Sequence, residues 1–269
     1  MPVSLEIPDG NPWWLSPDVW TVPGNNPEGS QGMPIAGEPC YIWARVTNNG
    51  SSTVDDATVR FYWANPAVGF DRTTANLIGT SYISLNERET ADVLCLVSWI
   101  PDFINQGHLC VLAEAFHPSF DPLLSANEFN VPTDRHVAQR NISIVNTSST
   151  MFKLSFEVHN TERKTRKYYL RAKIDKLSRI KQLHSHFGRN FKIPQKEGKV
   201  KNVGFLNVPC PKEENMKKVF AEIKGLKVEP GQRIGLTLVG DLKEGATLVH
   251  IEQVLDNQLI GGLSVLVLS

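Results

Sequence analysis

Four segments of the first half of the chain recur in the same order in the second half, and this repeat limits the possible folds more than any other feature. The matched segments are Val46-Thr-Asn-Asn with Val158-His-Asn-Thr, Glu87-Arg-Glu-Thr with Glu229-Pro-Gly-Gln, Gly107-His-Leu-Cys-Val-Leu-Ala-Glu with Gly245-Ala-Thr-Leu-Val-His-Ile-Glu, and Arg140-Asn-Ile-Ser-Ile-Val with Gly262-Leu-Ser-Val-Leu-Val. Each match is weak alone, but the shared order indicates a diverged duplication. A chain of 269 residues is long enough for two units with separate cores. We therefore expect two tandem domains, at residues 1–145 and 150–269.

The segments of the first half have the period of β-strands. From Cys40 to Val46, side chains alternate between an apolar face and a second face, and Asn48-Asn49-Gly50 then supplies a turn. Further strands are expected at Ala57 to Trp63, Gly79 to Leu85, a run in which Val93, Cys95, Val97 and Trp99 share a face, Leu109 to Phe116, and His136 to Val145. Short strands at this spacing, with no long helix between them, indicate an all-β chain of two tandem antiparallel immunoglobulin-like β-sandwich domains.

The second unit is expected to differ from the first by one or two short helices. Met216, Val219, Phe220 and Ile223 have helical spacing, with Pro211 able to begin the helix and Gly225 able to end it. The segment from Asp175 to Phe187 is a second candidate, and an ordered loop is the alternative there.

Charge is distributed unevenly between the two halves. Residues 1–140 contain six Arg, no Lys and sixteen Asp or Glu, a formal charge of −10, and the remainder carries +10. Opposite charges are expected if the domains attract each other, or if the second binds an anionic polymer or lipid, while ordinary surface composition explains them equally well. The basic candidates for a partner surface are Arg163, Lys164, Arg166, Lys167, Lys181 and Arg189. Solvated loops are the simpler interpretation of these side chains.

The segment before Pro39 is rich in Pro, Gly and Asn, and it also contains Trp13, Trp14 and Trp20. We expect an irregular arm that crosses the first domain and begins a strand near Val19. Packing of the tryptophans against the domain is favoured, because large aromatic side chains are mostly buried. If they are exposed instead, the three side chains are candidates for binding a partner.

Motifs for chemistry are weak in this sequence. His184 and His186 would share one face of a strand and are weak candidates for a metal site, because neighbouring lysines and arginines would repel a cation. Asp102, Asp121 and Asp134 lie in neighbouring loops, where a network of turn hydrogen bonds is favoured over calcium. The sequence contains no GxSxG, P-loop or GxGxxG motif. We expect no enzyme activity, no catalytic residue and no cofactor.

Several strings resemble a known family of modules. Ser16-Pro-Asp-Val-Trp, Tyr41-Ile-Trp-Ala-Arg-Val-Thr-Asn-Asn-Gly, Val59-Arg-Phe-Tyr-Trp-Ala-Asn-Pro, Ser98-Trp-Ile-Pro and Gly107-His-Leu-Cys-Val-Leu-Ala-Glu are similar to the bacterial cell-adhesion-related, or CARDB, immunoglobulin-like modules. The resemblance covers residues 16–145 and reaches the second half only through the repeat. It implies a bacterial source and an accessory sandwich attached to larger proteins, and it carries no catalytic residue.

The sequence therefore predicts a non-catalytic module for protein interaction, structure or adhesion, which would bind through exposed sheet edges or end loops. The alternative is binding of nucleic acid, acidic glycan or lipid by the basic second domain. No secretory signal and no membrane-spanning run is visible, which leaves localisation and oligomeric state open. Cys40 and Cys110 fall on strands that could be bridged, and buried thiols are the favoured interpretation.

Overall fold

The computed structural model describes residues 2–64, 67–68, 72, 75–101, 110–127, 129–147, 150–160, 162–188, 191–194, 196–206 and 219–269. The chain separates into two compact units. Unit 1 comprises Met1–Asn65, Asp71–Asn141 and Gln182–Phe191, and unit 2 comprises Pro66–Phe70, Ile142–Lys181 and Lys192–Ser269. Independent folding of each unit as a domain stays a prediction. No helix within the described ranges is long and apolar enough to cross a membrane.

Unit 1 contains two antiparallel sheets. In the first, the central strand β3 (Cys40–Asn48) pairs with β1 (Leu5–Glu6), β2 (Val19–Pro23) and β7 (Thr90–Leu94). The second sheet has the order β6 (Asn76–Leu85), β4 (Val54–Ala64), β8 (Cys110–Phe116) and β9 (Val137–Arg140).

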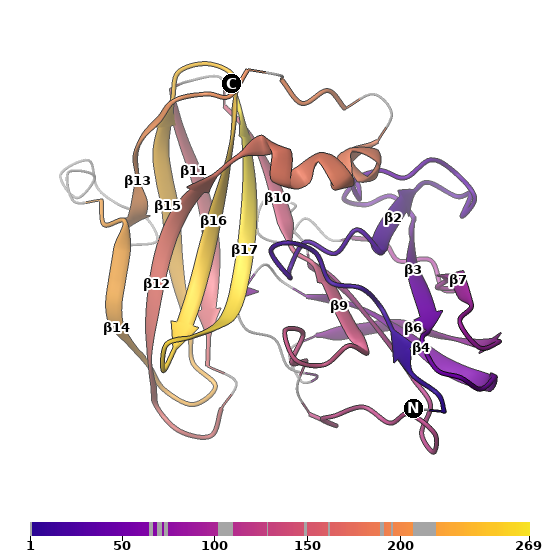
Figure 1. The fold of residues 1–269 in the computed structure, drawn as a ribbon. Helices are drawn as coiled ribbons and strands as arrows, with labels where there is room; N and C mark the ends of the chain where they lie inside the picture. The colour runs from indigo at the N-terminus through magenta and orange to yellow at the C-terminus, as the bar shows by residue number, and fades with distance from the viewer. Residues whose placement is uncertain are drawn as a thin grey trace. The chain divides into compact units, whose positions relative to one another are not determined.

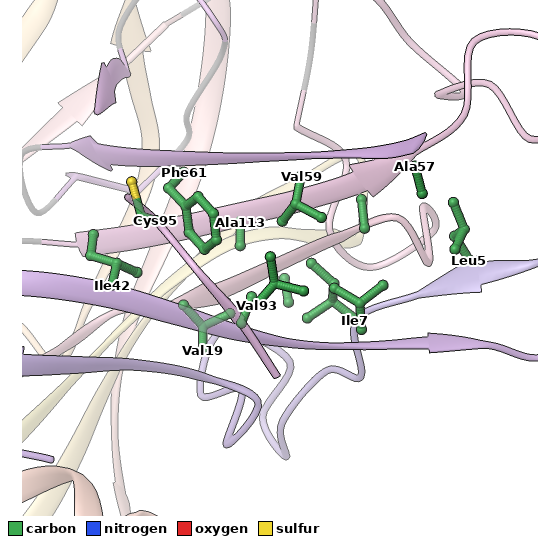
Figure 2. Close-up of a cluster of buried hydrophobic side chains, with 14 of the residues drawn as sticks. Leu5, Ile7, Val19, Ile42, Ala57, Val59, Phe61, Val93, Cys95 and Ala113 are labelled. Atoms are coloured by element: carbon green, nitrogen blue, oxygen red, sulfur yellow. The ribbon is translucent and has the colours of Figure 1, made fainter. Parts of the chain in front are cut away.

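The core of unit 1 follows from the alternation of side chains along these strands. In β3, Cys40, Ile42, Ala44 and Val46 are buried, and the residues between them face outward, as the sequence predicts. The inward side chains of both sheets form one cluster, in which Phe61 is fully buried. Figure 2 shows this cluster, with residues of β3, β4 and β8 pointing toward one another. The all-β sandwich fold predicted from the period of two is confirmed.

Unit 2 is built from two further sheets (Figure 1). One has the order β10 (Ile142–Asn146), β17 (Gln258–Leu268), β16 (Ala246–Leu255), β12 (Arg166–Asp175) and β14 (Glu222–Val228), and the other β13 (Val200–Leu206), β15 (Arg233–Leu242), β11 (Met151–His159) and β5 (Ala67–Val68). Pairing is antiparallel except for β10 with β17 and β11 with β5. Sixteen buried apolar residues of these strands form the core.

The two units share a strand order. The sheet β6-β4-β8-β9 of unit 1 corresponds to β14-β12-β16-β17 of unit 2, and the pair β3–β7 corresponds to β11–β15. The second half of the chain differs by the segment between β12 and β14, which contains β13 and a 3-10 helix, η2 (Leu177–Phe187), whose residues from Gln182 onward belong to unit 1. The segment from Asp175 to Phe187, left open between helix and loop, is therefore helical over most of its length.

A buried asparagine occupies the same position in each unit, directly after β11 and at the end of β3. The side-chain amides of Asn48 and Asn160 donate to the carbonyl four residues ahead, and their side-chain oxygens accept from the N–H two residues ahead. Each amide also donates to a distant carbonyl, that of Asn86 or Val228. Four hydrogen bonds at a fully buried side chain hold the turn that follows β3, or β11, to a distant part of the same unit.

The turn before the next strand also recurs, with a shift of one residue from the alignment made on the sequence. In residues 86–89 and 229–232, the fourth residue donates its N–H to the carbonyl of the first, and its side chain accepts from the first N–H. The third residue has a positive φ in both turns, 60° at Arg88 and 69° at Gly231. Asn86, and not Glu87, is thus the counterpart of Glu229.

Three local expectations are wrong. The helix proposed to end at Gly225 is contradicted by β14, which pairs with β12 and contributes Val228 to the core; residues 207–218 lie outside the described ranges. The expected strand from His136 to Val145 is two strands, β9 in unit 1 and β10 in unit 2. Val97 is exposed, because β7 ends at Leu94 and breaks the expected buried face.

We expect Asn48→Ala and Asn160→Ala each to destabilise its own unit by about 2–3 kcal/mol, because each leaves buried carbonyl and N–H groups without partners. All six tryptophans lie in unit 1, so tryptophan fluorescence follows the urea unfolding of that unit. The Asn48 variant should lower this fluorescence midpoint, and the Asn160 variant should lower only the circular-dichroism transition of unit 2. Asn49→Ala, at an exposed position, is the control. Equal effects of Asn48→Ala and Asn49→Ala would contradict the assignment.

Candidate binding surfaces

The tryptophans of the N-terminal arm are packed against unit 1. Trp14 and Trp20 are buried, and half-buried Trp13 lies edge-on to Trp14 with ring centroids 5.2 Å apart. Trp20, on β2, stacks on Trp43 of β3 at 6.1 Å, and the guanidinium of Arg45 lies 5.6 Å from the Trp20 ring. These contacts agree with the favoured packing interpretation, and they leave little aromatic surface for a partner.

Arg140 is a buried cation at the end of the unit 1 core. Its guanidinium donates to Thr21 Oγ1 at 2.7 Å and to Nδ1 of His186 at 3.0 Å, and burial lowers its pKa to about 10. Burial first, and then the charges of Arg140 and Arg45, lower the pKa of His186 to about 3. His186 is therefore a neutral acceptor that satisfies a buried cation.

His184 and His186 lie on a helix in the structure, whereas the sequence placed them on one face of a strand. Both lie on η2, where three residues make one turn, so side chains two apart diverge, whereas a strand would align them. His184 is exposed, and the nearest polar neighbour of His186 Nδ1 is a guanidinium. Within the described ranges, no group of three or more His, Cys, Asp or Glu side chains is placed to hold a metal ion.

The acidic residues considered for calcium are engaged by protein donors. Asp134 Oδ1 lies 2.6 Å from His136 Nδ1, and Asp121 Oδ2 lies 3.1 Å from His136 Nε2. Asp121 also pairs with Arg135 and accepts the N–H of Leu5 at 2.6 Å. The third acidic candidate, Asp102, lies outside the described residues. The two placed carboxylates form the kind of internal hydrogen-bond network that the sequence favoured.

The cysteines of the described ranges are buried thiols. Cys40 faces the core, and Cys40, Cys95 and Cys110 are unbridged. Burial raises the pKa of Cys40 to about 12, which keeps its thiol protonated and unreactive at neutral pH.

One grouping in unit 2 has the composition of a catalytic triad. His250 on β16 lies 2.8 Å from Ser264 Oγ on β17 and 3.2 Å from Asp175 Oδ2 at the end of β12. A nucleophile must reach a substrate, but Ser264 is 0% exposed and His250 is 2% exposed. Both lie on paired strands, in direct cross-strand register. The grouping therefore joins strands and offers no accessible nucleophile.

The predicted basic partner residues are split between solvent and ion pairs. Arg163, Lys164 and Lys167 are exposed around the turn from β11 to β12, and Lys181 is exposed on η2. Arg166 Nε donates to Glu162 at 2.7 Å, which neutralises its charge locally. Arg189 lies outside the described residues. Three of these residues thus lie around one turn, and Lys181 lies on a different element.

A second group of lysines lines a hollow of about 700 Å³ in unit 2. The lysine hollow consists of Thr150, Lys196, Glu197, Lys199, Lys201, Asp241, Lys243 and Glu244. Lys196 pairs with Glu244 at 2.6 Å. Among described residues, no carboxylate oxygen lies within 4 Å of the ammonium groups of Lys199, Lys201 and Lys243, so this hollow keeps unpaired positive charge.

Unit 1 has an edge strand without charged side chains, β6. Within the described part of the chain, β6 pairs with β4 only, so its other edge presents main-chain N–H and C=O groups. Fourteen consecutive residues, from Thr73 to Asn86, carry no charge, although residues 1–140 have a formal charge of −10. Leu77 is 56% exposed and Tyr82 is 68% exposed. A long, uncharged edge strand of this kind readily accepts another strand.

The corresponding edge of unit 2 is protected. β14 occupies the position of β6 but contains Glu222, Lys224 and Lys227 among its seven residues, and Gly225 interrupts it with a φ of 70°. Lys224 pairs with Glu222, and Lys227 pairs with Glu229 at 2.7 Å. Charged side chains on an edge strand oppose the approach of a further strand. Among the described residues, this edge thus carries charged side chains in unit 2 and none in unit 1.

His186 gives unit 1 a characteristic response to pH. Above its ordinary pKa of 6.5 the imidazole is neutral in the folded and unfolded chain, so its stabilising contact is fully present. As the pH falls from 6.5 toward 3, the unfolded chain takes up a proton that the folded unit refuses, and stability is lost. We expect His186→Asn, which keeps an acceptor without a titration, to reduce the loss between pH 7 and about pH 5 by roughly 2 kcal/mol.

The measurement is urea unfolding followed by tryptophan fluorescence at both pH values. His184→Asn, on the exposed side of η2, is the matched control and should behave as the wild type does. Identical pH dependence of wild type and His186→Asn would show that the imidazole is not held neutral.

No protein-family model and no curated protein sequence matches this chain. Among solved structures, the CARDB domain of a Pyrococcus furiosus protein, in complex with di-metal ions, is 16% identical, with a TM-score of 0.32 over 53% of this chain and 89% of that domain. A solution structure of the same domain has a TM-score of 0.27 at 16% identity, over 46% of this chain and 90% of that one. The CupB6 tip adhesin from Pseudomonas aeruginosa is 11% identical over 98% of this chain and 96% of its own, with a TM-score of 0.23. The chain is thus similar to CARDB domains in this comparison, and with TM-scores below 0.5 these likenesses carry no conclusion about its role.

Proposed function

We propose that the chain is a non-catalytic interaction module of adhesion type and bacterial origin, and that it binds extended protein segments through the open edge of β6. The observation that carries this proposal is that β6 contains no charged residue and, among the described residues, pairs with β4 only. Main-chain hydrogen bonds to an added strand supply affinity, and pockets between alternate side chains supply specificity.

Burial of the polar groupings supports the non-catalytic part of the proposal. Ser264, His250 and Glu114 are the kinds of residue that hydrolases use, and all three are buried. The carboxylate of Glu114 accepts from Tyr62 Oη at 2.8 Å and pairs with Arg72, so its oxygens are occupied by neighbours in unit 1. Groups that are engaged in this way stabilise strands and present no reactive atom to a substrate.

Peptide selection tests the proposed edge. A phage-displayed library of random peptides is selected on the immobilised full chain, and binding of the enriched peptides is then measured on variants. We expect peptides with alternating apolar and β-branched residues, and we expect Leu77→Lys/Tyr82→Lys to weaken them about ten-fold or more, since lysine opposes strand addition.

The control is Ser51→Lys/Thr53→Lys, which adds the same charge on exposed positions of the turn between β3 and β4. It should bind the selected peptides as the wild type does. The proposal fails if no peptide is enriched, or if enriched peptides bind the β6 variant unchanged.

A second candidate function is binding of acidic polymers, and the lysine hollow of unit 2 favours it. Lys199, Lys201 and Lys243 could contact successive anionic groups and release their counterions, which makes the affinity fall steeply with salt. We expect the chain to be retained on heparin, and Lys199→Gln/Lys201→Gln/Lys243→Gln to elute at clearly lower salt.

The matched control neutralises three exposed cations elsewhere in unit 2, as Arg163→Gln/Lys164→Gln/Lys167→Gln. It should elute close to the wild type if the hollow is the site. If the wild type is not retained on heparin, or if both triple variants elute at equally lowered salt, the lysine hollow is not an anion-binding site.

A further inference from the structure

Two hollows of unit 2 adjoin each other, and their linings differ in kind. One is the lysine hollow. The other has a volume of about 430 Å³ and is lined by Met151, Asn202, Val203, Leu206, Val219, Ala221, Val239, Gly240 and Asp241. We propose that the two hollows together bind one molecule of an anionic amphiphile, with its apolar chain in the second hollow and its head group among the lysines. This inference is independent of the edge of β6 and shares only the lysines with the second candidate function.

The second hollow, here called the apolar hollow, presents mainly hydrocarbon to a ligand. Six of the nine residues that line it have apolar side chains. Its two polar side chains bind each other, because Asn202 Nδ2 donates to Asp241 Oδ2 at 2.8 Å. A volume of this size falls within the range of small-molecule sites, roughly 300–1,000 Å³. The apolar hollow therefore suits a short alkyl or acyl chain.

One wall of the apolar hollow is held in place by main-chain pairing. Phe205 on β13 and Phe220 exchange main-chain hydrogen bonds of 2.8 and 3.3 Å. The neighbouring Val219 packs over Gly204, where an added Cβ would lie 2.6 Å from Val219 Cγ1. The absence of a side chain at Gly204 thus lets residues 219–221 lie close against β13. A wall that is fixed before binding lowers the entropic cost of binding a ligand.

Strand register places the two hollows side by side on one face of the sheet. Met151 on β11 and Lys201 on β13 both stand directly opposite Asp241 on β15, so the three side chains point to the same face. The adjacent Phe152 and Leu242 point the other way, into the core. Asp241 also lines both hollows. A ligand that crosses this row has an apolar side chain beside one part and an ammonium group beside the other.

The lysines supply the charge that an anionic head group requires. Glu197 and Asp241 accept hydrogen bonds from a main-chain N–H and from the Asn202 amide, and Glu244 pairs with Lys196. The lining lysines that have no carboxylate oxygen within 4 Å among the described residues are Lys199, Lys201 and Lys243. A carboxylate, sulfate or phosphate head group gains charge-assisted hydrogen bonds from such donors. A cationic head group would be repelled.

Isothermal titration calorimetry of the full chain with decanoate, kept below its micelle concentration, tests the inference. We expect decanoate to bind, and decyl phosphate to bind as well, because it joins the same chain to another anionic head group. Octanoate should bind about ten-fold more weakly, because it buries two fewer methylene groups. Decyltrimethylammonium, with a cationic head group on the same chain, should not bind at concentrations at which decanoate saturates the chain.

Two variants test the two hollows separately. Met151→Glu places a carboxylate in the apolar hollow at a position that is 38% exposed, and it should weaken decanoate binding about ten-fold or more. Ser155→Glu is the matched control, because Ser155 is exposed on the same face of β11 and does not line the hollow. It should bind decanoate as the wild type does. Lys199→Gln/Lys201→Gln/Lys243→Gln should weaken decanoate binding about ten-fold or more through loss of the head-group contacts.

The outcomes separate this inference from both candidate functions. Absence of decanoate binding, or equal binding by Met151→Glu and the wild type, overturns it. Retention on heparin without decanoate binding also overturns it and leaves the second candidate function standing. Binding to vesicles of anionic phospholipid without binding of decanoate overturns it too, because the ligand is then a surface and not a single molecule. Loss of decanoate binding in Met151→Glu, with heparin elution equal to that of Ser155→Glu, supports the amphiphile.

Discussion

The packing of two sheets face to face is the interaction on which the rest of the structure depends. It requires side chains to alternate between a buried face and an outer face, and β3 satisfies this requirement residue by residue. Burial of whole inward faces supplies each unit with a contiguous core, as in the clusters around Phe61 and Leu238. A sandwich made in this way necessarily ends in edge strands. The two units differ in the charge of the side chains on one such strand, β6 in unit 1 and β14 in unit 2.

The shared strand order makes unit 2 an internal reference for unit 1. The buried asparagines Asn48 and Asn160 and the two turns with positive φ recur in equivalent places, so we infer that both units descend from one ancestor. In this shared strand order, β6 and β14 are equivalent strands, but β14 contains charged residues and β6 contains none. A structural requirement of the fold would act on both strands, whereas an interaction specific to unit 1 explains the difference between them.

Much of the fold could be predicted from local patterns, and the remainder depends on contacts between distant residues. Alternation located β3 because buried residues recur at every second position from Cys40 to Asn48. The helical spacing around Phe220 and Ile223 was misleading, because pairing of β14 with β12 outweighs a local pattern. His184 and His186 were placed on a strand, and the contact of His186 with Arg140, 46 residues away in sequence, has no local signal.

The binding surface was the hardest part to predict. Exposed sheet edges were expected to bind, but the sequence does not say which strand lies at an edge, and the neutral run from Thr73 to Asn86 gains its meaning only from that position. The tryptophans and the basic loops were candidates for binding a partner because of their residue types. In the structure, Trp14 and Trp20 are buried, and Arg166 pairs with Glu162.

Hydrogen exchange of the main-chain amides tests the central claim, that the edge of β6 is made to accept a strand, most directly. Exchange of the full chain is followed by mass spectrometry with and without the peptides selected for binding, and chain segments covering β6 are compared with segments covering β14. The account predicts that amides of residues 76–85 become protected when a selected peptide is added, while those of residues 222–228 do not change. Exchange in β6 that is independent of the added peptides, or that changes equally in β14, would contradict it.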